Sequence, residues 1–500
     1  MPFSDRSKLP YELPDFESIK DEHYLPAFLS GCKEQLHEVA QILGSGAPTF
    51  ENTIEALERS GKALDRMLFV FYNKSSSDTN DTIDAIEEEI APLLAAHSDE
   101  IRLNPHLFGR IEALFNGIDG LGLDAESAWL LERYYRDFIH AGANLGFDER
   151  EELKKLNEQL SKLDTKFSQN LLNDTNDLAV IVDTVEELDG LSANEISAAA
   201  EAAAGRGLEG KWLLAMVNFT GNPMLSSLTN RNLRERIMLA SMQKGERPND
   251  NDNRGVLLEI VRLRAERANL LGFENHAAYV LSEQTAGNLE NVHGMLRKIA
   301  PAAVRNARSE AEDLQSAISA AGDTFSLASW DWDLYTEQVR LEKYNVDTSK
   351  FKSYFELERV LKDGVFWAAE QLFGVRFTER PDLVAYHPEA RVFEVHNQDG
   401  SPIGLFIGDF FTRDSKRGGA WMNNLVDQNH LLGQLPVVVN NLNIPKPAKG
   451  EPALLTFDET STLFHEFGHA LHGLFSNVNY PRFSGTSVQR DFVEFPSQVN

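Results

Sequence analysis

The amino-acid sequence predicts a mostly helical protein with a small β-sheet that precedes a histidine-rich helix. Three observations lead to this prediction. Apolar residues recur every three or four positions through most of the first half, as they do on amphipathic helices. Between residues 390 and 445 they run together or alternate, which is typical of strands. The stretch FHEFGHALHGLF, residues 464–475, then returns to helical spacing.

The first half predicts a series of packed helices. Residues 51–68 have helical spacing, and the pattern resumes in residues 230–242 and 253–273. The longest apolar seam alternates steps of three and four: Leu153, Leu156, Leu160, Leu163, Phe167 and Leu171. A coiled coil and a bundle helix are both compatible with this seam, and its short length favours the bundle. An alanine-rich stretch predicts a further short helix, followed by a loop near residues 205–210.

Two patterns predict the sheet. Residues 391–411, RVFEVHNQDGSPIGLFIGDFF, contain two strand-like runs separated by Asp399 and Gly400, a dipeptide that favours a hairpin turn. Residues 435–445, LPVVVNNLNIP, predict another strand, with Pro436 at its start, where the missing N–H does least harm. The sheet therefore comes directly before the histidine-rich helix.

The histidine-rich helix has a clear start and a polar face. Thr456 followed by Glu459 fits a capping box. The i, i+4 spacing of His465 and His469 places two imidazoles one turn apart on one face, as two ligands of one zinc ion require. Glu466 projects beside them, where its carboxylate is placed to take a proton from a water molecule. This is an HExxH motif; the alternative is a solvated helix face that carries histidines by chance.

A catalytic zinc site needs a third protein ligand and one open position. After His472 the sequence offers only two carboxylates, Asp491 and Glu494. The metzincin pattern fails because positions 472 and 475 are His and Phe rather than Gly and His. Glu494 is therefore the predicted third ligand. Asp491 is the weaker ligand candidate, and we expect it to orient a ligand histidine instead. His472 is expected to lie in the core or to support the site from outside the ligand set.

Composition and charge exclude several classes of function. The net charge of −29 argues against binding to nucleic acid or to an anionic membrane. Cys32 is the single cysteine, so the chain cannot form an internal disulfide. The N-terminus has no apolar signal-peptide core, and no apolar run reaches about 18 residues. We therefore expect a cytoplasmic monomer without a nucleic-acid or membrane partner.

Several separated motifs resemble one protein family. TLFHEFGHALHGLF and SGTSVQRDFVEFPSQ, within residues 462–498, are similar to the thimet oligopeptidase/neurolysin family of zinc peptidases. GDFFTRDSKRGGAWMNN, KPAKGEPALLTFDE and PTFENTIEALERSG are similar to its bacterial peptidyl-dipeptidase branch. The similarity extends from about residue 8 to the last residue.

The resemblance implies a zinc-dependent peptidase that releases dipeptides from the free C-termini of short peptides. It implies one Zn²⁺ per chain held by His465, His469 and Glu494, with Glu466 as the general base. Two alternatives remain: an endopeptidase of the oligopeptidase A type, and a zinc- or peptide-binding fragment without activity.

The resemblance also implies the architecture. We expect a helical zincin-type fold, a two-part ellipsoid around a deep groove that admits only short peptides. Residues 1–250 are expected to form one helical wall of the groove, and residues 251–500 the catalytic zinc-binding region. Family members continue beyond the position of Asn500 with helices that close the groove and residues that stabilise the oxyanion. We therefore expect this chain to lack the C-terminal part of the fold.

Residues 413–424, RDSKRGGAWMNN, supply candidates for peptide binding. Arg413, Lys416 and Arg417 are candidates to attract a peptide carboxylate, although such charges more often form a solvated surface cluster. Gly418 and Gly419 allow a close backbone approach or a hinge. An extended peptide commonly adds to a sheet edge, and GGAWMNN and LPVVVNN are the candidate edges. The alternative is that both are ordinary core or loop segments.

Overall fold

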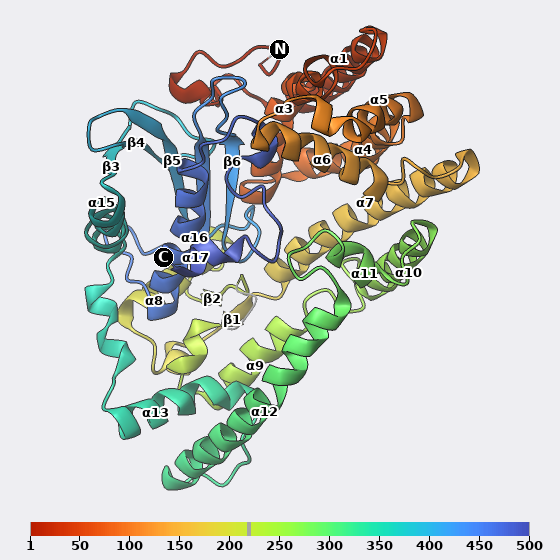
Figure 1. Cartoon of the computed structure of the whole chain (residues 1–500). Coiled ribbons are helices and arrows are strands. Elements are labelled where there is room, and N and C mark those ends of the chain that lie inside the picture. Colours follow the sequence, from red (N-terminus) through yellow and green to blue (C-terminus); the bar gives the residue numbers. More distant parts are fainter. Residues whose placement is uncertain (1, 218–221, 500) are drawn as a thin grey trace.

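Helices account for most of the structure, and they surround one five-stranded sheet (Figure 1). The computed structural model describes residues 2–217 and 222–499. The prediction of a mostly helical protein with a small sheet before the histidine-rich helix is confirmed. Within the described ranges, no helix is long and apolar enough to cross a membrane.

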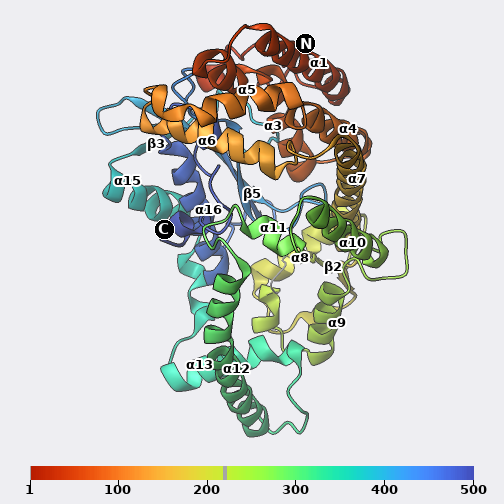
Figure 2. The same cartoon turned by 45° about the vertical axis from the view of Figure 1, so that its right-hand side comes forward.

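The N-terminal helices gather at one end of the molecule, and α9, α12 and α13 lie at the other (Figures 1 and 2). The helices before the long helix α7 are α1 (Tyr24–Gly44), α2 (Ala56–Arg59), α3 (Lys62–Ser77), α4 (Asp81–Arg102), α5 (Pro105–Asn116) and α6 (Ala125–His140). Those after it are α8 (Ala193–Gly205), α9 (Arg231–Met242), α10 (Arg254–Leu270), α11 (His276–Leu281), α12 (Leu289–Ala320) and α13 (Trp332–Tyr344). Helices α14 (Leu357–Arg359) and α15 (Trp367–Phe373) lead into the sheet, and α16 (Phe457–Leu474) and α17 (Glu494–Val499) follow it.

Helix α7 (Phe147–Asp177) connects the two ends and packs against α4 and α10. Leu156 and Leu160 of its seam share an apolar core with Ile260 and Leu263 of α10. The seam is therefore a contact within a helical bundle, as predicted, and not a coiled coil.

One predicted helix is interrupted. The helical pattern in residues 51–68 is divided: the π-helical segment Phe50–Glu55 leads into α2, and Gly61, between α2 and α3, adopts a left-handed conformation with φ of 72°. Such a conformation ends a helix, and glycine adopts it without a steric penalty. The predicted alanine-rich helix is α8, and a loop follows it as expected.

The five strands are arranged in the order β3-β4-β5-β7-β6. Their bounds are β3 (Arg376–Glu379), β4 (Arg391–His396), β5 (Pro402–Phe411), β6 (Trp421–Val426) and β7 (Val437–Ile444). β5 and β7 run parallel, and the other neighbours are antiparallel. Asp399 and Gly400 lie in the turn between β4 and β5, and β7 begins directly after Pro436, so both strand predictions are confirmed. A separate ribbon pairs β1 (Val180–Val182) with β2 (Trp212–Leu214).

Both faces of the sheet are covered, which explains why β5 and β7 are apolar runs without polar alternation. One face shares a core with α16, in which Phe406 and Val438 meet Phe467. The other face shares a core with the N-terminal helices, including Phe28 and Phe71. Helices α1, α3 and α4 thus share one core with the sheet. The predicted division near residue 250 stays a prediction.

Candidate active site

Helix α16 is held on the sheet by its apolar face. Its first turn has the predicted capping box: Thr456 Oγ1 accepts a hydrogen bond from the Glu459 N–H at 3.0 Å. Glu459 Oε2 in turn accepts from the Thr456 N–H at 2.7 Å. Phe467 packs edge-on against Phe406 of β5, with ring centroids 5.3 Å apart. Because Phe467 faces the sheet, the histidines at positions 465 and 469 project to another side of the helix.

Two histidines of α16 and one glutamate of α17 converge on one point. Nε2 of His465 and Nε2 of His469 each lie 3.1 Å from Oε2 of Glu494. The two imidazole rings are nearly perpendicular, at 87°, with centroids 5.0 Å apart. All three ligand atoms lie within 4.8 Å of one another. The structure thus brings together the three residues that the sequence predicts as ligands.

Glu494 is the most exposed member of this cluster. Its side chain is 57% exposed, against 10% for His469. Ser497 Oγ donates a hydrogen bond to Glu494 Oε2 at 2.9 Å. Partial burial acts to raise the pKa of Glu494, but this hydrogen bond and the two imidazoles outweigh it and lower the pKa below its ordinary value. Glu494 is therefore ionised at neutral pH.

Glu466 is buried beside the cluster on α16. Its side chain is 5% exposed, and its Oε2 has no hydrogen-bond partner among the described residues. Burial, and then the negative charge of Glu494, raise the pKa of Glu466 to about 8. A carboxyl group with this pKa takes up and releases a proton near neutral pH, as general acid–base chemistry requires.

His472 lies outside the converging cluster. It borders an apolar pocket together with Leu372, Phe475 and Phe495. Burial lowers the pKa of His472, and its Nδ1 has no hydrogen-bond partner within residues 2–217 and 222–499. The structure therefore separates His472 from the ligands, and a supporting role for it stays a prediction.

Asp491 contacts the loop between α11 and α12. Its Oδ1 accepts a hydrogen bond from the Thr285 N–H at 3.0 Å, and its Oδ2 accepts from the Ala286 N–H at 2.9 Å. These partners are 206 and 205 positions away, so no pattern in the sequence signalled the contact. The orienting role expected for Asp491 at a ligand histidine stays a prediction.

The cations predicted to attract a peptide have partners inside the protein. Arg413 Nη1 lies 3.0 Å from Oδ1 of Asp409, and Lys416 Nζ lies 3.0 Å from the same oxygen. The Asp409 side chain is fully buried, at 0% exposure. Arg417 Nη2 lies 3.2 Å from Oε1 of Glu87. Arg413 and Lys416 therefore belong to a buried ion-pair network rather than a solvated cluster. The attraction of Arg413 and Arg417 for a peptide stays a prediction.

Gly418 and Gly419 make a close backbone contact with residue 217. A Cβ on Gly418 would collide with the carbonyl oxygen of Val217. Gly419 has φ of 85°, and its N–H donates to the same carbonyl at 3.1 Å. The strand that follows, β6, lies at an edge of the sheet, whereas β7 is internal. Of the two candidate edge segments, GGAWMNN is the one that reaches an edge.

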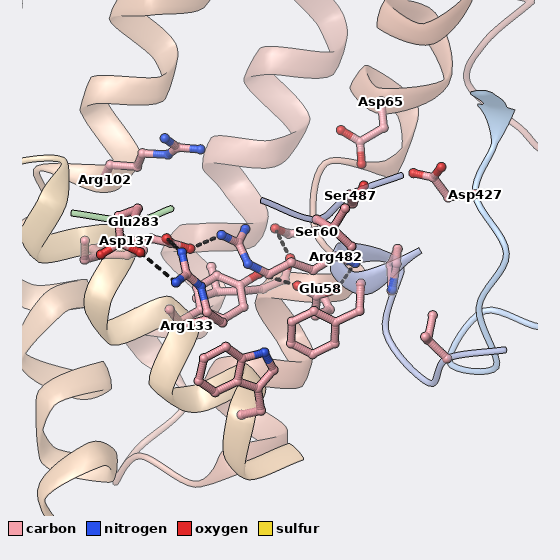
Figure 3. Close-up of a pocket in the computed structure, with 18 of the residues that line it drawn as sticks. Glu58, Ser60, Asp65, Arg102, Arg133, Asp137, Glu283, Asp427, Arg482 and Ser487 are labelled. Atoms are coloured by element: carbon pink, nitrogen blue, oxygen red, sulfur yellow. Dashed lines mark hydrogen bonds and ion pairs between the residues drawn. The ribbon is translucent and has the colours of Figure 1, made fainter. Parts of the chain in front are cut away.

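A cavity of about 1070 Å³ lies beside the segment that leads to Glu494 (Figure 3). It is bordered by α6, by the start of α3 and by residues 478–490. Figure 3 shows Arg133 linked to Asp137 and to Glu283, and both contacts measure 2.7 Å. The sequence did not predict this cavity, because its lining comes from several segments that are far apart in the chain.

The converging donors fit a zinc ion. Two imidazole nitrogens and a carboxylate oxygen are ligands that zinc prefers, and three protein ligands leave a fourth position open. Burial lowers the pKa of His469, which keeps this imidazole in the neutral form that binds metal. Both Nε2 atoms face the same carboxylate oxygen, so all three donors address one point.

Comparison with known proteins identifies the family of this chain. The family described as Peptidase family M3 matches residues 224–500. The chain is 44% identical over 500 residues to a dipeptidyl carboxypeptidase of Escherichia coli (strain K12), covering 100% of this chain and 73% of that protein. Oligopeptidase A of the same organism is 30% identical over 498 residues, covering 98% of this chain and 73% of that protein. A thimet-like oligopeptidase of Dictyostelium discoideum is 27% identical, over 90% of this chain and 68% of its own length.

Proposed function

Because this chain belongs to peptidase family M3, we propose that it is a zinc peptidase that releases dipeptides from the C-termini of short peptides. The observation that carries the proposal is the convergence of His465, His469 and Glu494 beside the buried Glu466. Relatives named dipeptidyl carboxypeptidase are 44% and 43% identical to the whole chain, whereas those named oligopeptidase A reach 30%. This difference supports the release of dipeptides.

Each residue of the site has a defined task in hydrolysis. His465, His469 and Glu494 would hold the metal, and the bound ion would supply a Lewis acid that acidifies water and polarises the scissile carbonyl. Glu466 accepts a proton from the attacking water and then delivers it to the leaving amine. Its raised pKa favours both transfers, because a carboxyl group that titrates near neutral pH gains and loses a proton with little penalty.

The edge strand supports the binding of an extended peptide. β6 lies at the edge of the sheet, and an extended peptide can add to such an edge through main-chain hydrogen bonds. We further propose that the enzyme acts as a cytoplasmic monomer, which the net charge of −29 and the single cysteine support.

A peptide with a free C-terminus distinguishes the candidate activities. The zinc-loaded chain is incubated with an N-acetylated peptide and with its C-terminal amide, and the products are identified by mass spectrometry. Stepwise loss of two residues from the free acid alone supports the proposal. Cleavage of one internal bond in both peptides favours an endopeptidase of the oligopeptidase A type, which the relatives at 30% identity keep open. If the peptides stay intact while one zinc is bound per chain, the result favours the alternative of a zinc-binding fragment without activity. Glu466→Gln is the matched inactive control.

A further inference from the structure

Glu494 needs support from outside its own helix. α17 spans only Glu494–Val499, and a helix this short is marginal in isolation. The hydrogen bond from Ser497 to the Glu494 carboxylate comes from the same helix and therefore moves with it, and the contacts with His465 and His469 come from the side chains that the site has to align. α17 packs against α16, and the segment before α17 adds a second restraint on the position of the carboxylate.

Hydrogen bonds anchor that segment at Asp491, three residues before Glu494. The Asp491 carboxylate accepts hydrogen bonds from the Thr285 and Ala286 N–H groups at 3.0 and 2.9 Å. The Asp491 N–H donates to Gln284 Oε1 at 3.3 Å. Together these three contacts between Asp491 and residues 284–286 are called here the Asp491 clamp. Two oxygens of one carboxylate bound to consecutive N–H groups restrict both the position and the orientation of the turn.

The turn between Asp491 and Glu494 transmits this restraint. The Val493 N–H donates to the Gln489 carbonyl at 3.0 Å, and the Phe495 N–H donates to the Phe492 carbonyl at 2.8 Å. These backbone hydrogen bonds connect the clamp directly to the first turn of α17. Movement of Asp491 would therefore move Glu494.

The loop that receives the clamp is itself anchored. Glu283, next to the clamp, forms an ion pair of 2.7 Å with Arg133 of α6. Arg133 also pairs with Asp137 one turn along α6, and Asp137 in turn pairs with Arg482 (Figure 3). Arg482 belongs to the same segment as Asp491, so the segment is tied to α6 directly through Arg482 and indirectly through the clamp. The clamp therefore joins Glu494 to a fixed part of the fold.

We propose that Asp491 is a positioning residue for the metal site: the clamp holds Glu494 in reach of His465 and His469 and so determines the affinity for zinc. The inference rests on the proposed ligand set. It assigns Asp491 a partner in the loop between α11 and α12. Asp491 acts on Glu494 and touches neither the metal nor the substrate.

Zinc affinity in a double-mutant cycle tests the proposal. The zinc dissociation constant is measured by competition with a chelator for wild type, Asp491→Ala, Glu494→Ala and the double variant. Asp491→Ala is expected to weaken binding about 10- to 100-fold, as loss of a supporting contact at a metal site commonly does. In the Glu494→Ala background, Asp491→Ala is expected to have no further effect, because its action passes through Glu494. A purely structural role would not produce this coupling.

Two further variants make the result specific. Asp491→Asn keeps one acceptor oxygen and is expected to bind zinc with intermediate affinity; if Asp491→Ala fails to fold, the cycle is read with this variant. Asp399→Ala removes a carboxylate that accepts from the Ser401 N–H at 2.9 Å in the β4–β5 turn, and it should bind zinc like the wild type.

The proposal is overturned if Asp491→Ala binds zinc as tightly as the wild type. It is also overturned if Asp491→Ala weakens zinc binding equally in the wild-type and Glu494→Ala backgrounds. Such a result leaves the proposed function standing as long as Glu494→Ala weakens zinc binding. Wild-type affinity in Glu494→Ala would instead overturn the ligand set, and the clamp with it.

Discussion

Oε2 of Glu494 lies 3.1 Å from Nε2 of His469, although the two residues belong to different helices. Burial lowers the pKa of His469, and the neighbouring groups lower that of Glu494. A neutral imidazole and an ionised carboxylate are the protonation states that a metal ion requires of its ligands. These two ligands are therefore already in the right charge state at neutral pH.

Glu466→Gln is expected to lower kcat by about 10²- to 10⁴-fold and to leave the zinc dissociation constant unchanged. Glutamine fills the same space but cannot accept the proton from water. Peptide hydrolysis and chelator competition on the same preparation test both parts. A variant that hydrolyses peptides at the wild-type rate would show that Glu466 is not the general base.

Zinc is expected to stabilise the chain, because the ligands converge only in the folded state. At a free zinc concentration 100 times the dissociation constant, the gain is about 2.7 kcal/mol. His469→Ala should lose most of the corresponding rise in melting temperature, as measured by calorimetry with and without zinc. His472→Ala is the matched control on the same helix, and it should keep the rise even if its baseline stability falls. Loss of the rise in His472→Ala would place that residue among the ligands.

Local patterns in the sequence predicted the helices and strands, but they could not predict which elements, far apart in the chain, lie side by side. The alternation and turn at Asp399 and Gly400 identify the β4–β5 hairpin because strand period and turn chemistry are local properties. The placement of β7 between β5 and β6 could not be predicted in this way. It depends on a parallel pairing of Phe406 with Val438, which no local pattern records.

The same distinction applies to the site. His465 and His469 were found because their spacing is a property of one helix, and Glu494 because few carboxylates follow them. The partners of Asp491 lie more than 200 positions away, so only the structure shows them. Arg413 lies in a segment with the composition of a surface loop. It is nevertheless largely buried because it pairs with Asp409, a residue that the sequence places within a strand but does not mark as buried.

Arg413→Ala is expected to lower the free energy of unfolding by about 3 kcal/mol, because it leaves the buried carboxylate of Asp409 with fewer partners. Arg417→Ala removes a more exposed charge but takes a partner from the buried Glu87, and its cost should be smaller, about 1–2 kcal/mol. Denaturant titrations compare the two variants, and peptide KM values are measured beside them. A higher KM for Arg413→Ala at unchanged stability would show instead that Arg413 binds the peptide carboxylate.

Asp427→Asn is expected to stabilise the protein at pH 7.5 and to change little at pH 4. Burial raises the pKa of Asp427 to about 6 from an ordinary value near 3.8. The folded state therefore holds its proton more tightly than the unfolded state, so this contribution is full below about pH 4 and is lost as the pH rises through about 6. A shift of about two units corresponds to about 3 kcal/mol.

Asparagine keeps the oxygen that accepts from Asn424 Nδ2 at 2.6 Å, so the variant removes the charge and preserves this hydrogen bond. Denaturation midpoints at the two pH values test the prediction, with the exposed Asp399→Asn as control. An equal effect at both pH values would mean that the ionisation of Asp427 is not the cause.

Gly418→Ala is expected to destabilise the fold by about 1–3 kcal/mol, because the added Cβ collides with the carbonyl oxygen of Val217 and the backbone has to move. Gly109→Ala is the matched control. It lies inside α5 with nothing within 4 Å of an added Cβ, so it should stabilise the protein by about 0.5–1 kcal/mol through helix propensity. Thermal melts without substrate separate the two effects from any role in peptide binding. If Gly418→Ala melted like the wild type but raised the peptide KM, Gly418 would serve the substrate rather than the contact with residue 217.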